Sequence, residues 1–284
     1  MVDTPLLDIE NLRVTFRTSH GIVEAVRGIG FTLGRERLGI VGESGSGKSQ
    51  TGRAILGLTA GNGTISADLL NFDGQDMRNL SEREWRTIRG KRISMVMQDP
   101  IYSLNPVMTV GRQVVEAYTT HHKVSPREAR EKTLEMFAAV KIRDPESVFD
   151  RYPHEVSGGM GQRIMIAMML IPDPDLIIAD EPTSALDVTV QLQVLAILDD
   201  LVRERGMGLI FISHDLSLIS SFCDRILVMY KGRIMEELKA SELHKAKHPY
   251  TRGLLNCLPS LDEPKAELRV LERDPAWENG DTNA

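Results

Sequence analysis

The chain has 284 residues, of which 42% are hydrophobic and 26% are charged, and its formal net charge is −6 at pH 7. This composition is typical of a folded globular protein and excludes a collagen-like chain, a disordered acidic tail and a disulfide-rich scaffold. The acidic balance argues against a protein that mainly coats nucleic acid. Two cysteines, Cys223 and Cys257, are too few for a secreted disulfide framework, so we expect a reducing compartment.

The sequence shows no sign of a membrane span or an export signal. The longest apolar run is the eight residues 164–171, whereas a spanning helix needs about 20 residues. The N-terminal residues contain no basic stretch followed by an apolar one. We therefore expect a cytoplasmic protein without a membrane segment of its own.

The first part of the chain predicts strands followed by a glycine-rich turn. Apolar residues alternate over residues 7–16 and recur over 23–33, which indicates strands. Residues 38–41 form a short apolar run that leads directly into the glycine-rich segment. A helix is expected after this segment, as far as about Leu58.

The middle of the chain predicts helices, and the last third returns to alternating strands and helices. A helical region is expected over about residues 99–171, with Ser157 at the start of its last helix. Apolar runs at 176–179, 209–212 and 226–229 are typical of buried parallel strands. The pattern as a whole predicts an α/β fold.

The glycine-rich segment Gly42–Ser49 has the sequence Gly-Glu-Ser-Gly-Ser-Gly-Lys-Ser, which fits the phosphate-binding pattern G-x-x-x-x-G-K-[ST]. Backbone N–H groups of such a loop, with the N-terminus of the following helix, surround phosphate oxygens. We expect Lys48 to reach the β- and γ-phosphates and the Ser49 hydroxyl to bind Mg²⁺. A dinucleotide site would need its glycines in the order G-x-G-x-x-G instead.

Two carboxylates follow the apolar run at residues 176–179. Ligands of open α/β sheets bind at the carboxyl ends of the strands, and successive strand residues point to opposite sides. We therefore expect different roles for the two acids. Asp180 is predicted to join Ser49 in holding Mg²⁺, and Glu181 to orient and deprotonate the attacking water.

Two further polar residues follow apolar strands. His214 comes after the run at 209–212, about 33 residues beyond Glu181, and is able to hydrogen-bond a γ-phosphate. Gln98 follows the mostly apolar segment 93–97, and its neutral amide is able to contact Mg²⁺ or water. Taken alone, a single histidine or a loop glutamine is more often structural.

Together these motifs resemble the ATP-binding cassette of an ABC transporter, over about residues 6–260. The resemblance also rests on the signature Val156–Gln162 and on the segment Ser184–Asp187 that follows the two carboxylates. Phe16 resembles the aromatic residue that stacks on adenine in this family, although a phenylalanine in an apolar strand is more often part of the core.

The resemblance implies a P-loop NTPase with a RecA-like α/β core, an antiparallel β-subdomain and an inserted helical subdomain at about residues 99–171. Residues 261–284 would form a partly flexible C-terminal extension. In this family ATP lies between two cassettes, so that the signature of one contacts the γ-phosphate on the other. The nucleotide contacts implied are Phe16, Gly42, Glu43, Ser44, Gly45, Ser46, Gly47, Lys48, Ser49, Gln50, Ser157, Gly158, Gly159 and Asp187.

Four further segments resemble the oligopeptide and dipeptide permease ATPases of the peptide and nickel import subfamily. They are residues 98–106, 152–155, 185–191 and 248–255. The resemblance implies an ATPase that uses ATP and Mg²⁺ to drive uptake of di- and oligopeptides, peripheral on the cytoplasmic face of the cell (inner) membrane. Uptake of nickel, glutathione or another small solute stays an alternative, as does, less favourably, a non-transport ABC ATPase.

The implied partners are a second ATPase subunit, related or identical, two transmembrane permease subunits and an extracytoplasmic substrate-binding protein, with no nucleic acid. Residues from about 99 to 113 would contact the permease. The signature departs from the usual pattern at Gly161, where many relatives carry a basic residue. This departure removes a cation near the expected interface between the cassettes.

Overall fold

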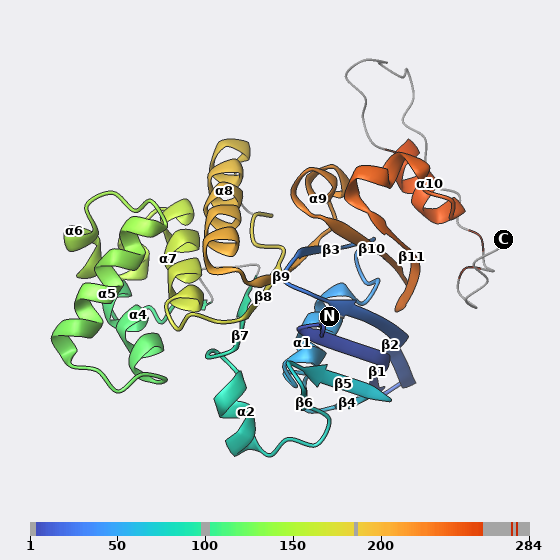
Figure 1. The fold of residues 1–284 in the computed structure, drawn as a ribbon, viewed down its shortest axis with the longest axis horizontal. Coiled ribbons are helices and arrows are strands. Elements are labelled where there is room, and N and C mark those ends of the chain that lie inside the picture. The colour runs from blue at the N-terminus through green and yellow to red at the C-terminus, as the bar shows by residue number, and fades with distance from the viewer. Residues whose placement is uncertain (1–3, 98–102, 185–186, 258–273, 275–276, 278–284) are drawn as a thin grey trace. The chain divides into compact units, whose positions relative to one another are not determined.

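A computed structural model describes residues 4–97, 103–184 and 187–257, together with Asp274 and Trp277 (Figure 1). The chain divides into two compact units. The first comprises Met1–Asn79 and Ile210–Ala284, and the second comprises Leu80–Leu209. The boundaries expected from the sequence, at residues 6–260 for the cassette and about 99–171 for the helical subdomain, stay predictions.

The first unit contains an antiparallel sheet built around its first strand. β1 (Leu7–Thr18) pairs with β2 (Gly21–Leu33) on one side, and with β4 (Gly63–Ser66) and β5 (Leu69–Phe72) on the other. The two-residue strand β6 (Gln75–Asp76) continues the sheet beside β5. β1 and β2 confirm the strands that the apolar alternation predicts over residues 7–33, whereas β4, β5 and β6 were not predicted from the sequence.

A β-bulge interrupts the alternation within β1. Leu7 and Ile9 are buried, and so are Leu12 and Val14, but the two pairs are out of phase by one residue. Asn11 adopts φ 50° between them, where the register with β2 shifts. Because an extra residue in one strand returns the following side chains to the same face, both pairs point into the core.

The first unit also contains strands of a second sheet, in the order β11-β10-β3-β9. β3 (Arg37–Val41) and β10 (Arg225–Tyr230) are parallel, and β11 (Arg233–Lys239) returns antiparallel to β10. β9 (Gly208–Ser213) belongs to this unit from Ile210 onward. Nearly every residue of β3, β9 and β10 is buried, as continuous apolar runs predict.

The helices of the first unit are α1 (Lys48–Ile55), α9 (Leu216–Phe222) and α10 (Pro249–Asn256), with a 3₁₀ segment η2 (Ala240–Lys245). α1 ends three residues before the predicted end at Leu58. Gly57 adopts φ 61° just after the helix, and a left-handed residue there stops the helical hydrogen bonds.

Most of the described helices belong to the second unit (Figure 1). Two parallel strands, β7 (Ile93–Val96) and β8 (Leu176–Asp180), pair within it. Its helical segments are α2 (Glu82–Ile88), α4 (Val110–Thr119), α5 (Pro126–Ala139), α6 (Pro145–Phe149), η1 (Pro153–Glu155), α7 (Gly158–Leu170) and α8 (Val188–Arg205). This series confirms the helical middle of the chain that the sequence predicts.

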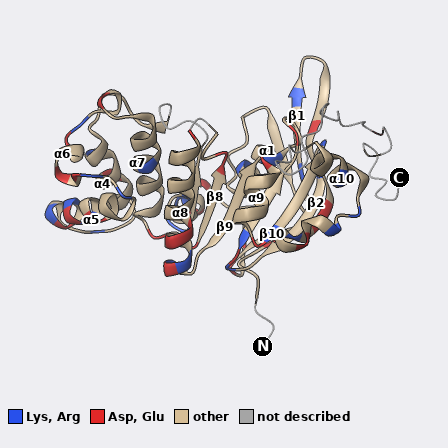
Figure 2. Cartoon of the chain, turned by 90° about the horizontal axis from the view of Figure 1, so that it is seen from above, with Lys and Arg blue, Asp and Glu red and all other residues tan. Residues whose placement is uncertain are grey.

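Charged residues of both signs are interspersed on the surface of α5 (Figure 2). Arg127 pairs with Glu131 at 2.9 Å along this helix, and Arg130 reaches Glu146 on α6 at 2.5 Å. Such exposed pairs contribute little to stability, because water and dissolved ions screen the two charges. Within the described residues, no helix combines the length and the apolar composition needed to cross a bilayer.

Candidate functional site

The glycine-rich segment Gly42–Ser49 forms the connection between β3 and α1. Gly47 caps α1 with φ 99°, and a Cβ atom there would lie 2.4 Å from the carbonyl oxygen of Ala25. A Cβ atom on Gly42 would lie 2.1 Å from the carbonyl oxygen of Met229. Because both obstacles are backbone atoms, glycine is required at both positions. The loop therefore turns tightly into the N-terminus of α1, where backbone N–H groups favour anions.

Side chains of this loop fit a phosphate group. Lys48 is 5% exposed, and its Nζ donates to the carbonyl oxygens of Gly42 at 2.8 Å and Glu43 at 2.9 Å. The Ser46 hydroxyl and Oε1 of Gln50 are buried and have no hydrogen-bond partner among the described residues. An unpaired buried hydroxyl is costly, and a phosphate oxygen would accept its hydrogen. The loop thus supplies a cation and an unpaired donor to a phosphate.

Two more predicted site residues lie in the first unit. Phe16 is half-buried on β1, and a Cβ atom on Gly63 would be only 2.8 Å from Cε1 of its ring. The ring therefore packs against β4. His214 directly follows β9 and is exposed. Its neighbours are fixed, because Asp215 donates its N–H to the Ser213 hydroxyl at 3.0 Å and caps α9.

The two predicted carboxylates lie in the second unit and differ in backbone conformation. Asp180 is the last residue of β8 and is 6% exposed. Glu181 lies beyond the strand with φ 48°, and its carbonyl oxygen accepts hydrogen bonds from the N–H and the hydroxyl of Ser184. The predicted alternation along one strand is therefore wrong for this pair. A left-handed turn, rather than the strand pleat, sets the backbone at Glu181.

The signature begins a helix, as the sequence predicts. Ser157 is the N-cap of α7, and its hydroxyl accepts the N–H of Met160 at 3.3 Å. Ser157 and Gly158 are exposed, and no atom lies within 4 Å of the position where a Cβ atom on Gly158 would lie. The start of α7 is therefore an open helix N-terminus, whose N–H groups favour a negative charge.

The signature helix contacts the segments that follow the two carboxylates. Nε2 of Gln162 donates to the carbonyl oxygen of Pro182, directly after Glu181. A Cβ atom on Gly159 would lie 2.9 Å from Cγ1 of Val190, on α8. Asp187 caps α8 by accepting the N–H of Val190 at 3.0 Å. The signature, the carboxylate segment and the start of α8 therefore form one packed assembly within the second unit.

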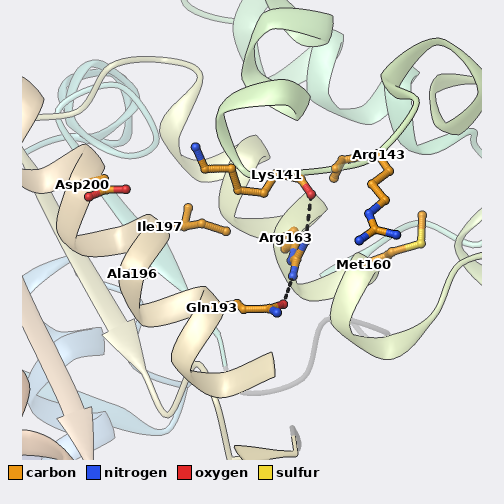
Figure 3. Close-up of a pocket in the computed structure, with 9 residues that line it drawn as sticks. Lys141, Arg143, Met160, Arg163, Gln193, Ala196, Ile197 and Asp200 are labelled. Atoms are coloured by element: carbon orange, nitrogen blue, oxygen red, sulfur yellow. Dashed lines mark hydrogen bonds between the residues drawn. The ribbon is translucent and has the colours of Figure 1, made fainter. Parts of the chain in front are cut away.

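Arg163 links α7 and α8 at a cavity of about 570 Å³ (Figure 3). Its guanidinium donates to the carbonyl oxygen of Lys141 at 2.8 Å and to Oε1 of Gln193. Arg143 and Met160 line the same cavity. Local sequence patterns do not predict this link, because it joins parts of the chain 22 and 30 residues away from Arg163.

The predicted site residues are thus distributed over both units. Gln98 and the segment 185–186 lie outside the described residues. The first unit holds Phe16, the loop Gly42–Ser49, Gln50 and His214, and the second holds Ser157, Gly158, Gly159, Asp180, Glu181 and Asp187. One contact of the loop was missed: Tyr250 on α10 accepts the N–H of Glu43 at 3.3 Å, from 207 residues away.

Comparisons with known proteins agree with the motifs. A family model described as "ABC transporter" matches residues 26–184. The chain is 50% identical over 272 residues to the oligopeptide transport ATP-binding protein OppD of Salmonella typhimurium, covering 95% of this chain and 81% of that protein. It is 47% identical over 269 residues to a putative peptide import ATP-binding protein of Brucella abortus, covering 94% of this chain and 81% of that protein.

Solved structures with a similar fold come from ABC transporters. One is a dimeric post-hydrolysis state of the cassette MJ0796 bound to ADP and Pi, with a TM-score of 0.73, 26% identity, and coverage of 82% of this chain and 98% of that one. Another is cbiO1 of Clostridium perfringens, with a TM-score of 0.73, 25% identity, and coverage of 86% of this chain and 92% of that one. The predicted fold class, a P-loop NTPase of mixed α/β structure, is confirmed.

Proposed function

Because this chain belongs to the ABC transporter family, we propose that it is the ATP-hydrolysing subunit of an importer of di- and oligopeptides. The observation that carries the proposal is the 50% identity to an oligopeptide transport ATP-binding protein over 95% of the chain. The 47% identity to a putative peptide import protein supports the same substrate class. Nickel and glutathione have no comparable support.

The loop Gly42–Ser49 would hold the phosphates of ATP. Lys48 and the Ser46 hydroxyl suit phosphate oxygens, and the half-exposed Phe16 suits stacking on the adenine ring. Mg²⁺ would be held by Ser49, Asp180 and Gln98, and would neutralise charge on the phosphate oxygens.

Hydrolysis would depend on residues that follow strand ends. We assign Glu181 to orient the attacking water and accept its proton, since its left-handed backbone turns it away from the path of β8. We assign His214, exposed after β9, to hydrogen-bond the γ-phosphate.

A second cassette would complete each ATP site. The open start of α7, at Ser157 and Gly158, presents N–H groups to solvent and suits the γ-phosphate of ATP bound to a partner cassette. Asp187, exposed at the start of α8, would contact the nucleotide at the same interface. The partner is either a second copy or a related subunit.

The permease would dock on the segment of about residues 99–113, of which the structure describes residues 103–113. Gln113 is 6% exposed and fixes this segment, because its side-chain amide bonds to both backbone groups of Asn105 and to the carbonyl oxygen of Met108. Val107 stands out of the fixed loop with 78% of its surface exposed. We assign this exposed apolar tip to contact with a membrane subunit, which would place the chain at the cytoplasmic face of the inner membrane.

Copurification from detergent-solubilised membranes tests this proposal. The tagged chain should recover two integral membrane permease subunits, and Val107→Asp should reduce the recovery while ATP binding is retained. Ile22→Asp is the matched control, because Ile22 is 73% exposed but lies on the β1–β2 hairpin. The proposal is contradicted if no integral membrane protein is recovered, or if both variants reduce recovery equally.

A further inference from the structure

A buried aromatic cluster in the first unit has no role in the proposed function. It consists of Tyr230, His248, Tyr250 and Trp277, and is called the aromatic cluster below. Tyr250 is fully buried, with its ring centroid 4.7 Å from that of Tyr230 and 5.8 Å from that of Trp277. The His248 ring lies 6.0 Å from Trp277. These contacts hold the Tyr250 ring in one orientation.

A hydrogen bond joins the aromatic cluster to the phosphate-binding loop. The N–H of Glu43 donates to the Tyr250 hydroxyl at 3.3 Å. Nζ of Lys48 donates to the carbonyl oxygen of Glu43 at 2.9 Å. Glu43 therefore contacts both Tyr250 and Lys48, the lysine that is expected to bind phosphate.

The backbone around Tyr250 is itself held from two sides. Nδ1 of His248 accepts the N–H of Tyr250 at 3.1 Å, which caps α10. The N–H groups of Lys247 and His248 donate to the Glu236 carboxylate, on β11, at 2.7 and 3.2 Å. The start of α10 is thus attached to β11, and these hydrogen bonds hold the backbone from which Tyr250 reaches the loop.

We propose that Tyr250 is a positioning residue for nucleotide binding, which keeps the Glu43 peptide in place so that the loop is formed before ATP arrives. The proposal rests on the proposed function, because it takes the loop to be the ATP site. Without the hydroxyl, the loop would populate other conformations, and apparent ATP affinity falls with the fraction of the binding-competent one. The ring itself would still fill the core.

The test compares Tyr250→Phe with Tyr230→Phe in the full-length chain. Each variant removes one hydroxyl from the aromatic cluster, but none of the described hydrogen bonds joins Tyr230 to the loop. The dissociation constant of a fluorescent ATP analogue is measured by titration. Hydrogen exchange of the peptide covering residues 42–50 is followed by mass spectrometry without nucleotide. Melting temperatures show whether each variant is folded.

Tyr250→Phe should bind the analogue about fivefold more weakly than wild type, the usual effect of one neutral hydrogen bond. Its loop peptide should also exchange faster, whereas Tyr230→Phe should match wild type in both measurements. Equal affinities and equal exchange in the two variants would overturn the positioning role while ATP binding by wild type still stands. Failure of wild type itself to bind the analogue would overturn the proposed function, and this inference with it.

Discussion

Replacing Gly47 with alanine tests how tightly the phosphate-binding loop is packed. Gly47 has φ 99°, a conformation that costs an L-residue about 1–2 kcal/mol. The new Cβ atom would also lie 2.4 Å from the carbonyl oxygen of Ala25, on β2. Because this obstacle is backbone, it cannot rotate away, and strand or loop must shift. Overpacking of this kind costs about 1–3 kcal/mol.

Gly45→Ala is the matched control for this variant. Gly45 has φ 80°, but nothing lies within 4 Å of the position that its Cβ atom would take. Gly45→Ala should lower the free energy of unfolding only by the cost of the left-handed backbone, about 1–2 kcal/mol. Gly47→Ala should lower it by about 2–5 kcal/mol, because overpacking adds to that cost. The free energy of unfolding is measured by urea denaturation without nucleotide. Equal losses in the two variants would refute the close packing of Gly47 against β2.

Three further predictions concern catalysis, nucleotide binding and a buried thiol. Glu181→Gln should retain ATP binding, lower the ATPase rate by about 10²–10⁴-fold and accumulate a dimer in size-exclusion chromatography; an undiminished rate would remove Glu181 from its role. Lys48→Ala should weaken ATP binding by about tenfold or more in a titration, because hydrogen bonds from a charged group contribute about 1.5–3 kcal/mol; unchanged affinity would contradict the loop assignment. Burial raises the pKa of the Cys223 thiol to about 12. Above about pH 9 the unfolded chain therefore loses this proton while the folded chain keeps it. The free energy of unfolding falls as the pH rises toward 12, by about 1.4 kcal/mol per pH unit from this group. Urea denaturation at pH 8 and 10 should show a smaller fall for Cys223→Ala than for wild type, and identical falls would contradict the burial effect.

The local features of the site could be predicted from the sequence because each depends on neighbouring residues. The spacing of glycines before Lys48 is enough to predict a tight turn from a strand into a helix, and α1 does begin at Lys48. Ser157 was predicted to begin a helix, and it is the N-cap of α7. In both cases the chemistry of one turn decides the structure.

The short helix α2 was missed although its signal is present. Ser81 and Glu84 form a capping box at the start of α2, in which the Ser81 hydroxyl accepts the Glu84 N–H and the Glu84 carboxylate accepts the Ser81 N–H. The pattern S-x-x-E is visible in the sequence. The helix that follows is only seven residues long, so its hydrophobic periodicity is too short to detect.

Features that depend on distant parts of the chain could not be predicted. The left-handed turn at Glu181 is stabilised by Ser184 and has no periodic signal. The bond from Glu43 to Tyr250 joins residues 207 positions apart, and only the folded sheet brings β3 and α10 together. Single-sequence patterns report local preferences, whereas such contacts follow from the packing of whole elements.

Uptake of labelled substrates in a strain lacking this chain tests the central claim most directly. Entry of a labelled oligopeptide and of labelled nickel is measured after complementation with wild type or with Glu181→Gln. The account predicts that wild type restores peptide entry, that Glu181→Gln does not, and that nickel entry is the same in all strains. Peptide entry that is undiminished in the deletion strain, together with nickel entry that only wild type restores, would contradict it.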